Sequence, residues 1–229
     1  MSSNHDSIRI FIGYDTREPI AYHVCVQSIM ETSSHPVCIT PLRLSNLQTV
    51  FNRERDPKQL TDFSFTRFLV PYLCGFEGWG IFIDGDMLLR EDIANLWNLK
   101  NDQDAVMVVQ HDAFQGDHSF LGNSIKMFPK FNWSSVMLFN NAKCTTLTPE
   151  FLQTVAYQDL HQFKWLENES AIGALPKKWN HLVGYYEPST DVALVHWTLG
   201  GPYFGGEFET AEFAAEWFAM RDKAFSVSN

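Results

Sequence analysis

Two aspartates separated by one glycine, Asp84-Gly85-Asp86, directly follow the apolar run Ile81-Phe82-Ile83. The run predicts a buried strand, and in extended geometry residues two apart point to the same side. Two carboxylates held so close repel each other and lose hydration unless a cation lies between them. A hard divalent metal would satisfy both acids and leave coordination positions open for phosphate oxygens. The alternative is a simple turn, because Asp and Gly are common turn residues.

A histidine at the end of another apolar run could complete such a site. His196 follows residues 192–195, so we expect it at a strand end, and an imidazole would shift metal preference from Mg²⁺ toward Mn²⁺. The alternative is a hydrogen-bonded core histidine. Gly200 and Gly201 follow, and their backbone N–H groups could approach an anion. His196 is therefore the best candidate for a third metal ligand beside Asp84 and Asp86.

Three further positions carry groups that could join this site. Arg67 stands among Phe and Leu and needs a partner, which could be the acid pair or a ligand phosphate; the alternative is a solvated arginine. Glu169 lies in an acidic run that is typical of a helix N-terminus. His111-Asp112 follows an expected strand, so it could border the same cleft or form a simple turn.

The elements that must position these groups alternate between strand and helix patterns, which predicts an α/β fold: a mostly parallel sheet with helices on both faces. The expected strands span residues 8–12, 37–40, 80–84, 105–110, 136–139 and 192–197. The expected helices begin at Pro19 and after Thr210, and span residues 63–73, 91–96, 149–162 and 170–175. Residues 113–132 show no clear period and are expected to form a functional or mobile loop.

Composition narrows the class of ligand. The chain has 229 residues, 45% of them hydrophobic, and a formal charge of −10. This charge argues against nucleic acid as a binding partner and favours metal-mediated binding of phosphate.

The first seven residues lack the apolar core of a signal peptide, and no apolar run reaches membrane-spanning length. Four cysteines without C-x-x-C spacing (Cys25, Cys38, Cys74 and Cys144) indicate buried thiols in a reducing compartment. We expect a cytoplasmic protein, with peripheral membrane association as an alternative.

Residues 8–203 resemble glycosyltransferase family 8 and its short bacterial and viral relatives, which are nucleotide-sugar-dependent enzymes of the GT-A fold. The opening strand and helix of that family resemble Ile10-Phe11-Ile12-Gly13-Tyr14-Asp15 with Tyr22 and Ser28-Ile29. Its "R-x-x-x-P" helix resembles the segment with Arg67 and Pro71, and its "Y-L-D-x-D … L-W" resembles Ile83-Asp84-Gly85-Asp86 with Leu96-Trp97.

The second half continues the resemblance in the same order. The end of the family's "N-S-G-V-M-L-x-N" resembles Val136-Met137-Leu138-Phe139-Asn140, and its "D-Q-D" resembles Glu167-Asn168-Glu169. Its "L-P-x-x-[YW]-N" resembles Leu175-Pro176-Lys177-Lys178-Trp179-Asn180. Its "H-x-x-G-x-x-K-P-W" resembles His196 with Gly200-Gly201-Pro202-Tyr203. Two departures stand out: Trp133-Ser134-Ser135 replaces Asn-Ser-Gly, and no lysine precedes Pro202.

The resemblance implies a single GT-A domain over residues 1–229, with a nucleotide-binding half at about 8–110 and an acceptor and sugar half at about 111–229. It implies transfer of a hexose-type sugar, with retention, from a UDP-sugar to a hydroxyl on a carbohydrate, lipid-linked or protein acceptor, with Mn²⁺ or Mg²⁺ as cofactor. The implied catalytic residues are Arg67, Ser134, Ser135 and Glu169. The implied donor-binding residues are Gly13, Tyr14, Asp15, Tyr22, Arg67, Asp84, Gly85, Gly200 and Gly201, with Tyr14 stacking on the base and Asp15 hydrogen-bonding to it.

Two other functions are compatible with the same scaffold. The missing lysine and the altered serine block are also typical of a non-catalytic module that binds a nucleotide sugar without turnover. A nucleotidyltransferase is less favoured, because that class has a glycine-rich basic loop after its first strand and this chain has one glycine there, Gly13.

Overall fold

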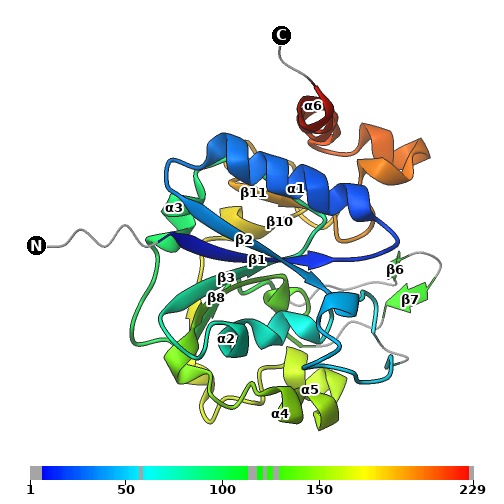
Figure 1. Ribbon diagram of the computed structural model, residues 1–229. Helices are drawn as coiled ribbons and strands as arrows, with labels where there is room; N and C mark the ends of the chain where they lie inside the picture. The colour runs from blue at the N-terminus through cyan, green and yellow to red at the C-terminus, as the bar shows by residue number, and fades with distance from the viewer. Residues whose placement is uncertain (1–6, 57–58, 113–117, 121–122, 126–128, 227–229) are drawn as a thin grey trace, which may run out of the picture.

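The computed structural model describes residues 7–56, 59–112, 118–120, 123–125 and 129–226. Its central sheet has six strands in the order β2-β1-β3-β8-β5-β9 (Figure 1). These strands are β1 (Ile8–Tyr14), β2 (Val37–Arg43), β3 (Trp79–Ile83), β5 (Val106–Val108), β8 (Val136–Asn140) and β9 (Ile172–Ala174). All neighbours pair in parallel except β8, which runs antiparallel to both β3 and β5. The expected mostly parallel α/β fold is confirmed.

A smaller three-stranded sheet lies beside the central one. It contains β10 (His181–Leu182), β11 (Leu194–His196) and β4 (Met87–Leu89), with β11 in the middle. Since β3 ends at Ile83 and β4 begins at Met87, the acid pair occupies the joint between the two sheets. The antiparallel register of β11 on β4 places His196 opposite Met87, next to that joint.

Helices cover both faces of the central sheet (Figure 1). One face carries α1 (Pro19–Thr32), against which α6 (Ala214–Phe225) packs from outside. The other face carries α2 (Val70–Leu73), α4 (Pro149–Thr154) and α5 (Tyr157–His161), while α3 (Ile93–Trp97) follows β4. The remaining hairpin joins β6 (His118–Phe120) to β7 (Asn123–Ile125). No helix among the described residues combines the length and apolar character needed to cross a bilayer.

The hydrophobic core is divided by the central sheet, as alternation along a strand requires. From β1, Phe11 packs on the side of α2 with Phe82 of β3, whereas Ile10 and Ile12 pack on the side of α1. A third cluster lies between α1, the small sheet and α6, and includes Val24, Trp197 and Trp217. The rigid sheet ends that carry the acids and the histidine are thus supported from both sides.

Several expected helices differ from the structure. The segment 63–73 is a 3₁₀ turn (Thr66–Leu69) that runs into the short α2. The expected helix 149–162 begins as predicted, with the Thr148 side chain accepting a hydrogen bond from the Phe151 amide, but it breaks at Val155 into α4 and α5.

The expected helix 170–175 is wrong, because residues 172–174 form β9 and pair with β5. Gly173 permits this pairing: a Cβ there would lie 2.2 Å from the carboxylate of Asp104. The strand expected at 105–110 is shorter, and most of the expected loop 113–132 lies outside the described residues or in the β6–β7 hairpin.

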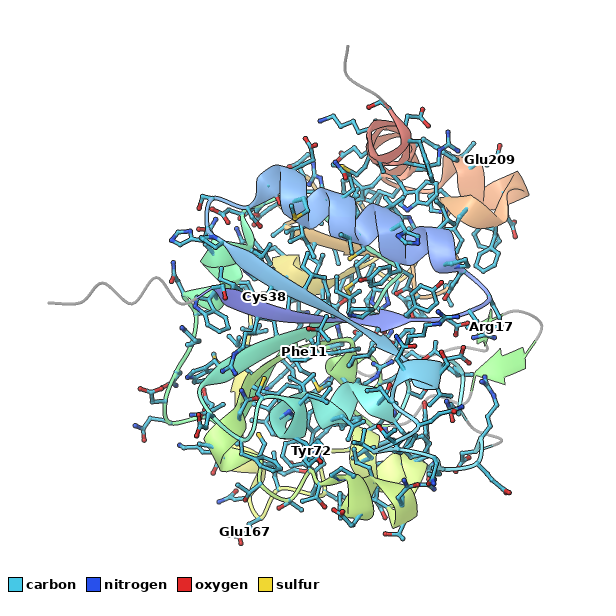
Figure 2. The ribbon with its side chains drawn as sticks, in the orientation of Figure 1. Phe11, Arg17, Cys38, Tyr72, Glu167 and Glu209 are labelled. Carbon is cyan, nitrogen blue, oxygen red and sulfur yellow. The ribbon has the colours of Figure 1, made fainter. Side chains whose placement is uncertain are left out.

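The four cysteines are free thiols with different exposure. Cys25 and Cys144 are buried as predicted, and burial raises the pKa of Cys144 to about 12. Cys38 is exposed and Cys74 is half-buried, so the prediction was wrong for these two. Cys38 is exposed because it lies on β2, an edge strand of the central sheet, most of whose side chains face outward (Figure 2).

Candidate functional site

The structure brings the three predicted metal ligands together. The ligand atoms of Asp84, Asp86 and His196 all lie within 4.8 Å of one another. His196 Nε2 is 3.4 Å from Asp86 Oδ1 and 3.9 Å from Asp84 Oδ2. Asp84 is 8% exposed and His196 is 1% exposed, so the cluster is shielded from bulk water. A plain surface turn, the alternative considered for the acid pair, does not describe this buried arrangement.

The glycine between the acids allows two strand ends to touch. A Cβ on Gly85 would lie 2.3 Å from the backbone oxygen of Gly13, a separation that real side chains do not adopt. Gly13 is itself confined, because a Cβ there would lie 2.5 Å from the ring of Phe63. Both predicted glycines therefore let the end of β1 approach the acid-bearing turn.

Arg67 has the acid pair as its partner. Its Nη1 lies 3.0 Å from Asp84 Oδ1 and donates to the backbone oxygen of Ser134 at 2.9 Å. The guanidinium also lies over the rings of Phe63 and Phe82, each 5.1 Å from the ring centroid. With 5% exposure, Arg67 is not the solvated arginine considered as its alternative.

The acid pair is electrostatically suited to a cation. Burial raises the pKa of Asp84 to about 7; the nearby Arg67 opposes this rise and the charge of Asp86 adds to it. Asp84 Oδ1 faces Arg67, whereas Asp84 Oδ2 and Asp86 Oδ1 face the imidazole of His196. Asp86 Oδ1 is buried and accepts no hydrogen bond from the described residues. One oxygen from each acid beside an imidazole nitrogen forms a donor set that fits Mn²⁺ or Mg²⁺.

A small cavity of about 70 Å³ adjoins the acids and the histidine. Besides Arg67, its walls come from the segment before β3, from the turn before β8 and from α5. They include Thr61, Ser64, Phe131, Asn132, Tyr157, His161 and Thr198. His161 Nδ1 is 2.8 Å from Ser134 Oγ, which itself lies 3.4 Å from Arg67 Nη1. Polar groups therefore surround the cavity on the side opposite the metal ligands.

The two predicted serines face different surroundings. Ser134 contacts Arg67 and His161, two residues that line the cavity. Ser135 is 1% exposed, and its hydroxyl donates to the backbone oxygen of Asn132 at 2.6 Å. It also lies 2.8 Å from Asn180 Nδ2, so its hydroxyl is held by the protein.

Among the predicted nucleoside-binding residues, Asp15 is fully engaged. Its two carboxylate oxygens accept hydrogen bonds from the backbone and guanidinium of Arg17 and from the Asp62 amide. These bonds tie the loop after β1 to the segment before Phe63. Tyr14 and Tyr22 pack edge to face, with ring centroids 5.3 Å apart, near the same loop.

The structure does not bring Glu169 into the cavity wall. Its side chain is 80% exposed and pairs with Lys130 Nζ at 2.6 Å. Glu169 is not one of the described residues that line the cavity.

The glycine pair follows β11 as predicted: Gly200 has φ +119°, and a Cβ on Gly201 would lie 2.4 Å from the ring of Tyr203. His111 and Asp112 are not among the described residues that line the cavity: Asp112 pairs with Lys177 Nζ at 2.8 Å on the exposed surface, while His111 is buried.

Two buried residues of the site escaped prediction. Glu18 is 7% exposed, and burial together with the charge of Asp86 raises its pKa to about 8. Its position just before Pro19 looks in sequence like an ordinary acid at a helix start. Asn180 is fully buried and contacts His196; the only sequence signal for it was the "L-P-x-x-[YW]-N" likeness.

No protein-family model matches the chain. Protein CDI of Arabidopsis thaliana is 42% identical over 226 residues, which cover 94% of this chain and 86% of that protein. The chain belongs to the family of Protein CDI. That name specifies no reaction, so the activity has to be inferred from the site.

Solved structures establish the fold class. The bifunctional glycosyltransferase WbbM superimposes with a TM-score of 0.65 at 14% identity, over 94% of this chain and 49% of that one. The galactosyltransferase LgtC, solved with donor and acceptor sugar analogs, gives 0.61 at 10% identity over 97% and 98% of the two chains. GlyE of Streptococcus pneumoniae gives 0.62 at 12% identity, over 94% of this chain and 61% of that one. The chain has the GT-A fold of glycosyltransferases and spans about half of WbbM.

Proposed function

We propose that this protein is a metal-dependent glycosyltransferase of the family 8 type that moves a hexose-type sugar from a UDP-sugar to an acceptor hydroxyl, with retention. The observation that carries the proposal is the buried cluster of Asp84, Asp86 and His196 at the joint between the two sheets of a GT-A fold. In this proposal the whole chain works as one domain, with the nucleotide bound by its first half and the acceptor by its second.

Asp84, Asp86 and His196 would hold the metal, Mn²⁺ in preference to Mg²⁺ because one ligand is an imidazole. The bound metal supplies positive charge that stabilises the departing diphosphate. The protein contributes a second fixed cation: Arg67 is held by Ser134 and by aromatic rings, and its buried Nε donates to no described residue. We assign Arg67 to the phosphate nearest the sugar, because preorganised donors stabilise charge without reorganising.

The remaining residues divide by location. Ser134, which was predicted, and His161, which was not, would meet sugar hydroxyls, since His161 lines the cavity and its Nδ1 lies 2.8 Å from Ser134 Oγ. Tyr14 and Tyr22 are placed to pack against the base, and the backbone of Gly200-Gly201 to approach the far phosphate in place of the missing lysine. A role for Glu169 at the anomeric carbon requires its side chain to leave Lys130.

The decisive experiment incubates the protein with UDP-hexoses and Mn²⁺ and follows hydrolysis or transfer by mass spectrometry. We expect turnover that Asp86→Asn lowers by about 10²-fold or more, because a buried metal ligand is lost. Asp222→Asn is the matched control, since this acid is exposed on α6 and pairs only with its neighbour Arg221 among the described residues. Equal turnover in both variants would contradict the metal-dependent mechanism.

The non-catalytic module is the second candidate, favoured by the absent lysine and the altered serine block. Both candidates predict that UDP with Mn²⁺ raises the melting temperature, because a ligand that binds only the native state stabilises it. Stabilisation without turnover in any acceptor mixture would identify the module. Turnover that depends on Asp86 would identify the enzyme.

A further inference from the structure

A chain of hydrogen bonds connects the backbone before β8 to the imidazole of His196. Ser135 Oγ lies 2.6 Å from the backbone oxygen of Asn132 and 2.8 Å from Asn180 Nδ2. Asn180 Oδ1 lies 2.9 Å from His196 Nδ1. The three side chains of this chain, Ser135, Asn180 and His196, are at most 1% exposed, so water does not compete for their bonds.

The direction of every bond in this chain follows from its first member. The backbone oxygen of Asn132 can only accept, so the single hydroxyl hydrogen of Ser135 points to it. Ser135 Oγ must then accept from Asn180, which assigns Nδ2 to the serine side of the amide and Oδ1 to the histidine side. Because Oδ1 can only accept, the hydrogen of a neutral His196 ring resides on Nδ1.

His111 supports the same orientation from another side. Its Nε2 lies 2.8 Å from Asn180 Nδ2, and its Nδ1 contacts the hydroxyl of Tyr186. Burial lowers the pKa of His111 to about 3, so its ring is neutral and Nε2 can accept from the amide. Two acceptors, Ser135 Oγ and His111 Nε2, therefore hold the amide NH₂ away from His196.

We propose that Asn180, oriented by Ser135, is a positioning residue that keeps His196 in the Nδ1–H form, with the lone pair of Nε2 directed at Asp84 and Asp86. Nε2 is the ring atom that faces the acids, at 3.4 Å from Asp86 Oδ1. A metal binds the nitrogen that carries no proton, and outer partners of a ligating histidine are worth about 10–100-fold in metal affinity. The proposal rests on the proposed function for the identity of the ligand, a divalent cation, but the ring form itself is a property of the metal-free protein.

The first test needs no metal and no variant of the network. ¹⁵N-histidine NMR of the metal-free protein at about pH 8, well above the ordinary histidine pKa, reports which ring nitrogen carries hydrogen. The His196 signals are assigned by their loss in His196→Gln. We expect a hydrogen on Nδ1, where Asn180 Oδ1 accepts it. A ring whose Nδ1 carries no hydrogen would overturn the proposal.

The second test measures Mn²⁺ affinity by titration calorimetry and electron paramagnetic resonance. We expect Asn180→Leu to weaken Mn²⁺ binding by about 10–100-fold, and Ser135→Ala to weaken it by a smaller factor although it does not touch His196. Asn180→Asp retains the acceptor and should keep most of the affinity. If Asn180→Leu does not fold, Ser135→Ala and the ring form of the unaltered protein still decide the question.

Asn141→Leu is the matched control. Asn141 is as buried as Asn180, but it follows β8 at the end opposite Ser135 and donates to the backbone of Glu77. This variant should lose stability and keep Mn²⁺ affinity. Equal losses of affinity in the two leucine variants would overturn the positioning role and leave the metal site standing. An unaltered protein that binds no Mn²⁺ would refute the metal of the proposed function, while the NMR result would still judge the network.

Discussion

Glu18 introduces a third acid next to the proposed metal ligands. It directly precedes α1, yet its side chain caps no helix amide and turns inward toward Tyr203. Burial of the carboxyl and the charge of Asp86 raise its pKa and favour the protonated form, and the hydrogen bond with Tyr203 opposes this rise. In the absence of metal, this residue therefore opposes folding at alkaline pH.

The pH dependence has a definite sign. The pKa of Glu18 is about 8 in the folded protein against an ordinary 4.5, so the folded state binds the proton more tightly and stability falls as pH rises through this window. We expect Glu18→Gln to raise the unfolding free energy of the metal-free protein by about 1–3 kcal/mol at pH 8, and to change it little below pH 4.5. Urea unfolding at both pH values measures this.

Glu209→Gln serves as the control for that experiment. Glu209 is exposed on the outer surface near α6, so the substitution should leave the unfolding free energy unchanged at both pH values (Figure 2). If Glu18→Gln behaves like Glu209→Gln, the carboxyl of Glu18 is ionised in the folded protein, contrary to our interpretation.

Single residues also show where sequence reasoning reached its limit. Asp84 and His196 were predictable because each directly follows an apolar run, and Asp86 because it stands two residues after Asp84. That the acids and the histidine meet at the joint between two sheets was not visible in the sequence. Glu18 and Asn180 were not, because their roles depend on which way the side chain turns. Ser135 illustrates the same point: the serine is present, but its hydroxyl bonds to Asn132 and Asn180.

Among the elements, the contact between the end of β1 and the turn after β3 is the tightest at the site. We expect Gly85→Ala to destabilise the protein by about 1–3 kcal/mol and to weaken Mn²⁺ binding, because its Cβ would lie 2.3 Å from the Gly13 oxygen and push the acids apart. Chemical denaturation and calorimetry measure the two effects.

The control for this prediction is Gly75→Asn. A Cβ there meets nothing within 4 Å, and its left-handed backbone, with φ +65°, is one that asparagine tolerates. A Gly85→Ala protein as stable as this control would show that the strand ends separate freely, and would contradict the proposed close packing.

Strands were predicted better than helices for a physical reason. β3 and β8 are apolar runs, and β1 carries Ile8, Ile10 and Ile12 at alternate positions, so the burial of these strands is visible in their composition. The antiparallel direction of β8 and the pairing of β9 with β5 depend on contacts between distant segments, which no local pattern contains. Residues 172–174 were therefore predicted as helical, although their pairing with β5 makes them a strand.

At the scale of the whole molecule, α6, near the end of the chain, packs against α1, near its beginning. Trp217 is 2% exposed and packs in one cluster with Val24 of α1 and with Trp197, the residue after His196. Its ring also lies 5.6 Å from that of Tyr203, beside the glycine pair. Salt bridges from Glu216 to Arg90 and from Lys223 to Glu31 add to this attachment.

We expect Trp217→Ala to lower the unfolding free energy by about 3–5 kcal/mol, because a large side chain is removed from a closed cluster. Mn²⁺ affinity should fall as well, since Trp197 loses its support beside His196. Phe225→Ala is the control on the same helix: with 69% exposure, it should change neither quantity. Stability unaffected by Trp217→Ala would mean that α6 is not a structural part of the domain.

The pairing of β11 with β4 has a consequence for the synthesis and folding of the chain. The two acids are synthesised before His196, and joining them requires closing the long stretch of chain between them. A growing chain thus holds the carboxylates without the imidazole of the proposed metal site. Tight binding of a divalent cation there would require β11 to be docked on β4, so cation affinity would report on this pairing.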